Sequence, residues 1–346
     1  MTGHAAGTMV AGVLMLAGTA LAAGAPAPET VQGLYAGTWK DARGAAEAEV
    51  RCVALGKDDY RLLVRRTLNG TVARAEVPGK AEAGKGTVAF AGKCADVAWA
   101  AEWTADAIRG TIGADGALEV KRVKKTPPTL GKRPTEGAVV LLDGKNFDHM
   151  RPRGAKPPPG NKAAATPPAS PWGTIGEDGS IQIPRGGMES VATFAGSYDV
   201  HVEFLCPLQP GARGQGRGNS GCYQPCGQEI QVLDSFGMET YKGGGCGGLY
   251  GKKDPDTMEP IPSLADKKEN VFTLASLPPL EWQTYDIEFR VKEQSPGQKV
   301  GRLTVYHNGV RIHDNVELKC GAGRFFFQDH GNPVRYRNIW VVERKD

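Results

Sequence analysis

The stretch Gln228-Glu-Ile-Gln-Val-Leu-Asp-Ser235 decides the fold, because apolar and polar side chains alternate along it. In a strand with this pattern, Glu229 and Gln231 share one face, while Ile230 and Val232 share the other. The alternation recurs nearby in Asp199-Val-His-Val-Glu-Phe204 and in Trp282-Gln-Thr-Tyr-Asp-Ile-Glu-Phe-Arg290. A sheet of such strands has an apolar back and a polar front, and polar groups gathered on one sheet face indicate a sugar-binding cleft.

Composition favours a turn-rich globular protein with two domains. The chain has 346 residues, with Gly 47, Pro 24 and a formal net charge of +4. Its length allows two domains that each bury a core. The small net charge and the scattered lysines and arginines give no reason to expect a nucleic-acid partner.

The N-terminus predicts export. An apolar run from Met9 to Ala23 ends in Ala20-Leu-Ala-Ala23, which has the small-residue spacing of a signal-peptidase site, although no basic residue precedes the run. The run is too short to span a bilayer. We therefore expect a signal peptide over residues 1–23 and a secreted or periplasmic protein, with no membrane span.

Seven cysteines agree with an oxidising compartment. Cys52 and Cys94 both lie in the N-terminal region and are candidates for one disulfide. Cys222 and Cys226 are candidates for a structural bridge, in which Cys246 is a possible partner, because no second cysteine pair supports a metal site.

The sequence predicts an all-β protein. Residues 29–125 read as short strands, with a hairpin signal at Asp115-Gly116, and form a small antiparallel β domain. Residues 126–136 are a Pro-rich linker. Residues 137–346 contain many strands and almost no helical periodicity, which favours a jelly-roll β-sandwich, with a Pro-rich insertion at residues 151–171.

The second domain resembles a known family. The resemblance rests on ordered blocks, among them Leu141-Leu-Asp-Gly-Lys-Asn-Phe147, Gly218-Asn-Ser-Gly221, Glu229-Ile-Gln-Val-Leu-Asp-Ser235, Gly247-Gly-Leu-Tyr-Gly251, His307-Asn-Gly-Val310 and Gln328-Asp-His-Gly-Asn332. From about residue 137 onwards the chain is similar to the 3-keto-disaccharide hydrolase domain family. The resemblance implies a concanavalin-like lectin/glucanase jelly roll and action on glycosides whose glucose carries a ketone at C3.

A weaker similarity to retaining glucanases helps to place the site. Those enzymes carry Glu-x-Asp-x-x-Glu on a bulged strand, and the same offsets here give Glu229-x-Gln231-x-x-Asp234. A glutamine cannot perform the relay of the middle carboxylate. Gln231 therefore argues against a two-carboxylate glycosidase and against an ordinary endo-glucanase.

A ketone at C3 permits different chemistry, because it makes the proton at C2 acidic. A general base removes this proton, and the resulting enolate expels the group at C1. The adjacent carbonyl and hydroxyl oxygens suit a hard divalent cation such as Ca²⁺, Mg²⁺ or Mn²⁺. We expect Glu203, Glu229 and Asp234 to be its ligands.

The candidate catalytic residues are Glu229, Asp234 and His330. Polar and aromatic groups expected to bind the sugar are Glu203, Asn219, Gln231, Tyr250, Trp282, Gln328 and Arg337. Structural roles remain open for several of them. Glu203 could be solvated, Asp234 could cap a turn, His330 could belong to the turn before Gly331, and the aromatic residues could pack in the core.

The sequence therefore predicts a secreted hydrolase or lyase that cleaves 3-keto-glucosides. The ketone would be made beforehand by a separate sugar 3-oxidase. The alternative is a lectin-like carbohydrate-binding module without turnover, which would need no buried general base on the strand that carries Glu229.

Overall fold

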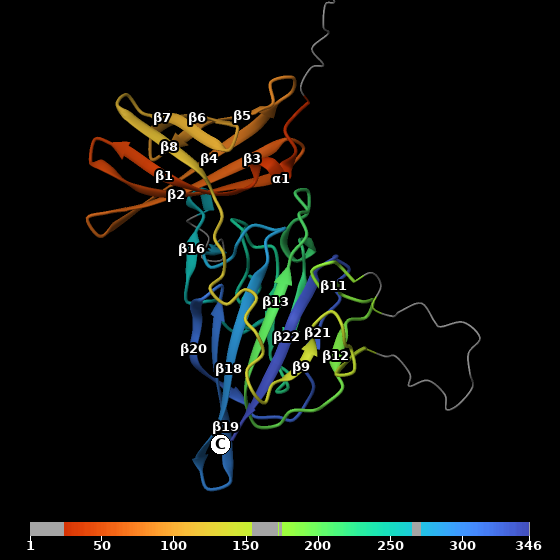
Figure 1. The fold of residues 1–346 in the computed structure, drawn as a ribbon. Coiled ribbons are helices and arrows are strands. Elements are labelled where there is room, and N and C mark those ends of the chain that lie inside the picture. Colours follow the sequence, from red (N-terminus) through yellow and green to blue (C-terminus); the bar gives the residue numbers. More distant parts are fainter. Residues whose placement is uncertain (1–23, 154–171, 173–174, 265–270, 346) are drawn as a thin grey trace, which may run out of the picture.

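The chain folds into a β-barrel and a β-sandwich that pack against each other. A computed structural model describes residues 24–153, 172, 175–264 and 271–345. Figure 1 shows the barrel at one end of an elongated molecule and the sandwich at the other. The expected all-β fold, with a jelly-roll sandwich behind a small antiparallel domain, is confirmed.

The N-terminal unit is a closed barrel of eight antiparallel strands, in which β1 pairs with both β2 and β8. A short helix, α1 (Pro28–Val31), precedes the barrel. The strands are β1 (Gly33–Asp41), β2 (Gly44–Gly56), β3 (Asp59–Leu68), β4 (Thr71–Glu82), β5 (Thr87–Cys94), β6 (Val97–Thr104), β7 (Ala107–Ile112) and β8 (Gly116–Val123). Closure removes both sheet edges, and the interior is filled by apolar side chains, including Tyr35, Phe90 and Trp103.

The sandwich consists of two packed sheets. The first has the strand order β10 (Met150–Pro152), β12 (Met188–Ser190), β21 (Phe326–Phe327), β14 (Ser220–Tyr223), β15 (Glu229–Val232). The second has the order β11 (Ile181–Gln182), β22 (Arg335–Arg344), β13 (Ser197–Leu205), β18 (Gln283–Ser295), β19 (Gln298–His307), β20 (Val310–Lys319), and β9 (Val139–Leu142) also pairs with β22.

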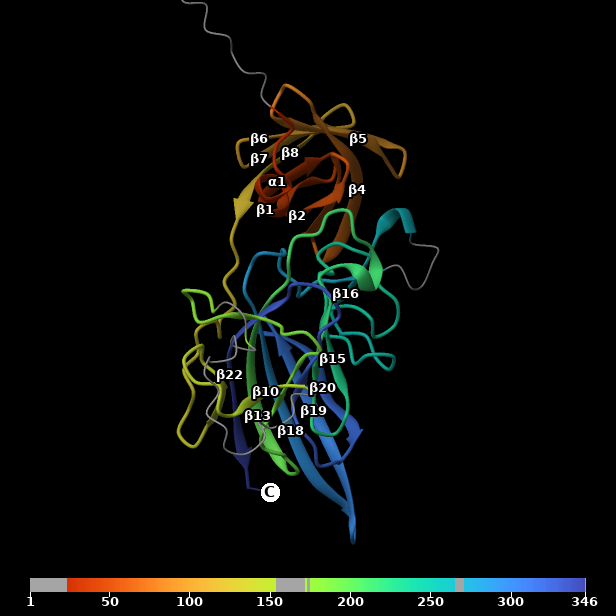
Figure 2. The ribbon, with the colours of Figure 1, turned by 90° about the vertical axis from the view of Figure 1, so that its right-hand side faces the viewer.

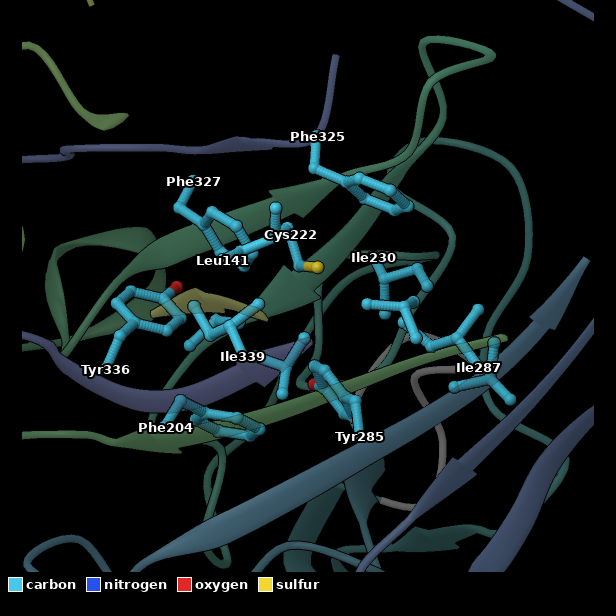
Figure 3. Close-up of a cluster of buried hydrophobic side chains, with 14 of the residues drawn as sticks. Leu141, Phe204, Cys222, Ile230, Tyr285, Ile287, Phe325, Phe327, Tyr336 and Ile339 are labelled. Atoms are coloured by element: carbon cyan, nitrogen blue, oxygen red, sulfur yellow. The ribbon is translucent and has the colours of Figure 1, made fainter. Parts of the chain in front are cut away.

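Apolar side chains from both sheets meet in one core between them (Figure 3). Ile230 and Phe327 come from the first sheet, and Phe204, Tyr285 and Ile287 come from the second. Because strand side chains alternate, the neighbours of these residues point to the two outer faces of the sandwich. This alternation places Glu229 and Gln231 outside the core, as the sequence pattern predicts.

The barrel rests on loops at one end of the sandwich (Figure 2). Two short 3₁₀ turns, η1 (Gly214–Gly216) and η2 (Pro262–Leu264), and a small sheet of β16 (Met258–Pro260) and β17 (Val271–Thr273) lie among these loops. Val53 of the barrel packs with Phe236 and Met238 of the sandwich in a small apolar cluster.

Buried arginines also join the two units. The Arg51 guanidinium donates to the carbonyl oxygens of Ser276, at 2.8 Å, and Leu274. Arg61 donates to the carbonyl oxygen of Gly237. A carbonyl oxygen that is buried without a donor costs free energy, so these bonds satisfy loop groups that packing removes from water.

Two predictions about the chain ends and insertions fall outside the described residues. These are the signal peptide over residues 1–23 and almost all of the insertion, from residue 154 to residue 171. Within the described part of the chain, no helix has the length and apolar character needed to cross a bilayer.

The expected Cys52–Cys94 disulfide is not formed. Cys52 points into the barrel core from β2, whereas Cys94 ends β5, and its thiol lies 3.8 Å from the carbonyl oxygen of Arg74. The bridge expected around Cys222 and Cys226 is also absent, because Cys222 packs in the sandwich core and Cys246 lies beside the Tyr285 hydroxyl.

The junction makes a prediction about Gly237, which lies under the barrel with φ +63°. A Cβ added there would lie 2.5 Å from Val53 Cγ2. We expect Gly237→Ala to lower the free energy of unfolding by about 1–3 kcal/mol, through backbone strain and overpacking. Denaturant unfolding measures this loss. Gly297→Ala is the matched control, since Gly297 has φ +77° but open space around it. An equal loss in both variants would contradict a role for the junction.

Candidate active site

A row of polar and aromatic side chains crosses the outer face of the five-stranded sheet. The strand register pairs each member with the next, in the order Arg151, Glu189, Phe326, Tyr223, Glu229. A second row lies beside the first on the same face, two positions along each strand, and consists of Arg153, Gly187, Gln328, Gly221 and Gln231. The two glycines leave gaps in the second row, and side chains of the first row lean into those gaps.

Five members of these rows, Arg153, Glu189, Tyr223, Phe326 and Gln328, line a cleft of about 580 Å³. Tyr223 lines one end, Phe326 and Gln328 line the middle, and Arg153, Glu189 and Arg324 line the other end. The Tyr223 side of the cleft lies next to Glu229, its strand partner. The cleft therefore combines aromatic surface with hydrogen-bonding and charged groups, as sugar sites do.

Glu229 occupies a nearly closed position beside this cleft, with only 6% of the residue exposed. Its carboxylate lies over Gly221, where an added Cβ would overlap Glu229 Oε1. Burial raises the pKa of Glu229 above its usual value, and interaction with the Tyr223 hydroxyl offsets part of this rise. A carboxylate with a raised pKa, next to a cleft, has the character of a general base.

Tyr223 and Glu229 form a pair in which the Tyr223 hydroxyl is the hydrogen-bond donor. Burial, reinforced by the neighbouring Glu229 carboxylate, raises the pKa of Tyr223, so its hydroxyl keeps its proton. The site thus places a basic group and a proton donor side by side on adjacent strands.

Gln231 is fixed by a network of amides. Its Nε2 donates to Gln215 Oε1 at 2.7 Å, and the Asn219 side-chain amide donates to the same oxygen at 3.0 Å. Asn219 and Gln231 are both almost completely buried. Among the predicted substrate-binding residues, these two are therefore brought together, through the η1 residue Gln215.

Two tyrosines stand at the exposed rim near Glu229. The Tyr250 backbone N–H donates to the Glu229 carbonyl oxygen, and the hydroxyls of Tyr241 and Tyr250 are 2.8 Å apart. Both residues are 41% exposed. Exposed aromatic rings beside a cleft are suited to stack on a sugar ring.

Gln328 and His330 lie at the end of β21. Gln328 lines the cleft, and its backbone N–H donates to Gly221. His330 follows the cleft residue Asp329 but is itself exposed. Gln328 therefore lies on the cleft floor, whereas His330 is not among the residues that line the cleft.

The structure does not bring Asp234 to the cleft. Strand β15 ends at Val232, and the Asp234 side chain is completely buried against Arg217, with Arg217 Nε 2.8 Å from Asp234 Oδ2. The Asp234 carboxylate also accepts from the Phe236 backbone N–H. Asp234 therefore holds the turn beneath the barrel, and no sugar can reach it.

Glu203 lies on the opposite outer face of the molecule. It belongs to β13 of the second sheet, whose inward residues Val202 and Phe204 pack in the core. Its carboxylate accepts from Arg337 Nε at 2.7 Å, from the Asn338 side-chain amide at 2.8 Å and from the Gly131 backbone N–H. Glu203 and Arg337 therefore fasten the linker to the back of the sandwich.

Trp282 belongs to this second face as well, because the Arg337 guanidinium lies 4.1 Å from the centre of its ring. The predicted substrate-binding residues are thus divided between two faces, and Glu203, Trp282 and Arg337 lie away from the cleft.

The buried His201 completes the charge cluster at the linker. Its ring nitrogens lie 2.9 Å from Asp286 Oδ1 and 3.4 Å from Glu203 Oε1. Burial favours the neutral ring, but the bonds to these two carboxylates outweigh burial and raise the pKa of His201. Burial also opposes ionisation of Glu203, but its bonds to His201, Asn338 and Arg337 lower the Glu203 pKa to about 2.

The three expected metal ligands do not converge. Glu203 and Glu229 lie on opposite outer faces, and Asp234 is paired with Arg217. No group of three His, Cys, Asp or Glu side chains within the described ranges is arranged to hold a metal ion. The predicted ligand set therefore does not fit a shared cation, and a requirement for a divalent cation stays a prediction.

Several cleft residues were missed by the sequence analysis, namely Arg153, Glu189, Gln215, Tyr223, Tyr241, Arg324 and Phe326. Tyr223 could have been found from the sequence. It lies two residues after Gly221, on the other side of Cys222, so in a strand its side chain points to the same face as Gly221. Glu189 and Phe326 lie on strands of only three and two residues, which are too short to show a period.

The linker cluster makes a prediction about pH. Folding lowers the Glu203 pKa from the usual 4.5 to about 2, so the ionised form stabilises the folded state above pH 4.5. This stabilisation is lost as the pH falls through about 2. We expect Glu203→Gln to unfold more easily than the natural protein near neutral pH, and the difference to shrink below pH 4.5. Urea unfolding across this range tests it, and a constant difference would argue against the ionic role.

Comparison with known proteins gives one family match and two similar solved structures. Residues 137–342 match the family model described as 3-keto-alpha-glucoside-1,2-lyase-like domain. No curated protein matches the chain. A provisionally assigned glycosyl hydrolase from Parabacteroides distasonis ATCC 8503 is 26% identical over 60% of this chain and 84% of its own, with a TM-score of 0.45. Xylan beta-1,4-xylosidase from Bacillus halodurans C-125 is 10% identical over 86% of this chain and 65% of its own, with a TM-score of 0.27.

The family match spans more than half of the chain and covers the sandwich except for the last two residues of β22, so it includes the strand that carries Glu229. The resemblance expected from the sequence is therefore confirmed. The match concerns a family that acts on carbohydrates, and the cleft lies within the matched residues. The chain belongs to the family of 3-keto-alpha-glucoside-1,2-lyase-like domains.

Proposed function

We propose that this protein cleaves 3-keto-glucosides, with Glu229 as the base that removes the proton at C2. The observation that carries the proposal is the buried Glu229 carboxylate, whose pKa is raised, beside Tyr223 and a cleft of about 580 Å³. Membership of the lyase-like family supports the substrate class. A protein that only binds sugars has no need for a basic carboxylate kept from solvent.

The proposed reaction proceeds in two steps. Glu229 takes the C2 proton, and the electrons of the C2–H bond form an enolate that the C3 carbonyl stabilises. The enolate then forms a C1–C2 double bond, and the bond between C1 and the leaving oxygen breaks, so that this oxygen departs with the electron pair. Water that adds across the double bond converts the elimination into net hydrolysis.

The neighbouring groups divide the remaining work. Tyr223 keeps its hydroxyl proton and stands next to the base, which suits it to donate to an oxygen that becomes negative. Gln231, held by Gln215, can orient sugar hydroxyls. Tyr241 and Tyr250 offer aromatic surface at the rim.

The proposal extends to the setting of the reaction. We infer that a separate sugar 3-oxidase introduces the ketone at C3, because removal of the C2 proton requires a ketone that is already present in the substrate. The apolar run from Met9 to Ala23 supports export to the periplasm or the exterior.

Replacement of the base gives the first test of the reaction. We expect Glu229→Gln to keep the fold and to lower turnover of a 3-keto-disaccharide by at least about a hundredfold, because the amide cannot accept the C2 proton. Glu288→Gln is the control, since Glu288 lies on β18 of the other sheet. The natural protein should gain activity as the pH rises through the raised Glu229 pKa. Undiminished turnover in Glu229→Gln would reject Glu229 as the base.

One experiment tests both whether the substrate must carry a ketone and whether activity requires a divalent cation. Product release is measured from a 3-keto-disaccharide and from its unoxidised parent, each with added divalent cation and with a chelator. We expect cleavage of the keto sugar alone, because only its C2 proton is acidic. Loss of activity on chelation would establish the predicted cation, with ligands other than the three expected side chains. Cleavage of both sugars would contradict the elimination chemistry, and cleavage of neither would favour the lectin-like alternative.

A further inference from the structure

The end of the cleft away from Glu229 is rich in arginine. Arg151, Arg153 and Arg324 lie there with two carboxylates, Glu189 and Asp329. This end takes no part in the proton transfer proposed for Glu229, and it contains groups that the sequence analysis did not identify.

Both carboxylates at this end are already engaged. Glu189 Oε1 accepts from Arg151 Nη2 at 2.6 Å and from Arg151 Nε at 2.9 Å. The two oxygens of Asp329 accept backbone N–H groups from Gly186 and Gly331. Neither carboxylate is therefore the partner of Arg153, and three arginines face two acids, which leaves a local excess of positive charge.

Arg153 is held over the cleft floor by an aromatic ring. Its guanidinium carbon lies 4.2 Å from the centre of the Phe326 ring. The ring itself leans across Gly187, where a Cβ would lie 2.6 Å from Phe326 Cε2. Within the described residues the Arg153 guanidinium has no ion-pair partner, so its planar set of N–H donors is available to a ligand.

The Arg153 guanidinium lies in the direction in which the leaving group of a bound substrate would extend. Phe326 stands on β21, two strands from Glu229 on β15, which corresponds to roughly 10 Å at the usual strand spacing. The cleft runs from Tyr223, beside Glu229, past Phe326 to Arg153 and Arg324. When C2 of the keto sugar lies at Glu229, a group attached to C1 that enters the cleft extends towards these arginines.

We propose that Arg153, stacked on Phe326 and assisted by Arg324, binds an anionic group on the leaving part of the substrate, a carboxylate being the group that fits its planar donors best. The Arg324 guanidinium is anchored to the carbonyl oxygen of Ser190 at 2.9 Å and also contacts that of Val191. Its Nε also lies 3.9 Å from Glu189 Oε1, so Arg324 shares this carboxylate with Arg151 and holds its charge at a fixed place. This inference names the substrate class of the site and rests on the proposed function.

The test uses two 3-keto-glucosides that differ only at the far end of the leaving group, 4-carboxyphenyl and 4-carbamoylphenyl. The ratio of their kcat/KM values is compared between variants, so that the different leaving abilities of the two phenols cancel. We expect Arg153→Gln to lower the relative preference for the carboxylate by roughly threefold to tenfold, because kcat/KM falls more for the carboxylate than for the amide. Arg153→Lys should recover part of the preference.

The control is Arg109→Gln, because Arg109 is an exposed arginine of the barrel whose partner is Glu119. It should leave the ratio as it is. Higher salt should lower the preference of the natural protein and should have less effect on Arg153→Gln, since screening weakens partly exposed charge pairs. An unchanged ratio in Arg153→Gln, or an equal loss with both substrates, would overturn the proposal.

A binding measurement separates this inference from the proposed reaction. Calorimetry compares 4-hydroxybenzoate with 4-hydroxybenzamide, the two leaving groups, in the natural protein and in Arg153→Gln. Tighter binding of the acid that disappears in Arg153→Gln supports the anion subsite even when no substrate is cleaved, and in that case the reaction fails while the subsite stands. Equal binding of acid and amide by the natural protein overturns the subsite, whatever the result of the activity assay.

Discussion

The hydrogen bonding of β15 on both of its edges is the constraint on which the site depends. On one edge β15 pairs with β14, and on the other the Gln231 N–H donates to Gly248 at 2.9 Å, while Tyr250 donates to Glu229. The strand would otherwise be the open edge of its sheet, free to shift its register. Because a shift by one residue exchanges the two faces, this double pairing keeps Glu229 outside the core and Ile230 inside it.

The alternation in residues 228–235 predicted the outward direction of Glu229 and Gln231, and the many strands with almost no helical periodicity predicted the fold class. It could not predict which outer face Glu203 would occupy, because alternation relates a side chain to its own strand and not to the other sheet. The prediction that Asp234 belongs to the site was wrong for a local reason, because the strand ends at Val232 and the chain then turns beneath the barrel. The pairing of Arg217 with Asp234 joins residues 17 positions apart and has no periodic signal.

The barrel and the linker hold the sandwich at separate places. The segment after β15 carries Phe236 and Gly237 into the junction, where barrel side chains enclose them. On the opposite face, the linker residues Thr129 and Gly131 bond to Asp286 and Glu203. A rotation of the barrel about the linker would have to break both sets of contacts, the apolar packing at the junction and the hydrogen bonds to the two carboxylates. The barrel is therefore a fixed part of the molecule, and it supports the strand that carries Glu229.

The shape of the cleft depends on two glycines, which have no side chain beyond a hydrogen atom. Phe326 fills the space above Gly187, and the Glu229 carboxylate fills the space above Gly221. Each of these spaces is too small for a methyl group. Replacement of either glycine by alanine would therefore displace a wall of the cleft. A methyl group at Gly221 would displace the Glu229 carboxylate itself, whereas one at Gly187 would press on the Phe326 ring and on the backbone oxygen of Phe327. One glycine therefore fixes the position of the proposed base, and the other fixes the aromatic floor on which Arg153 rests.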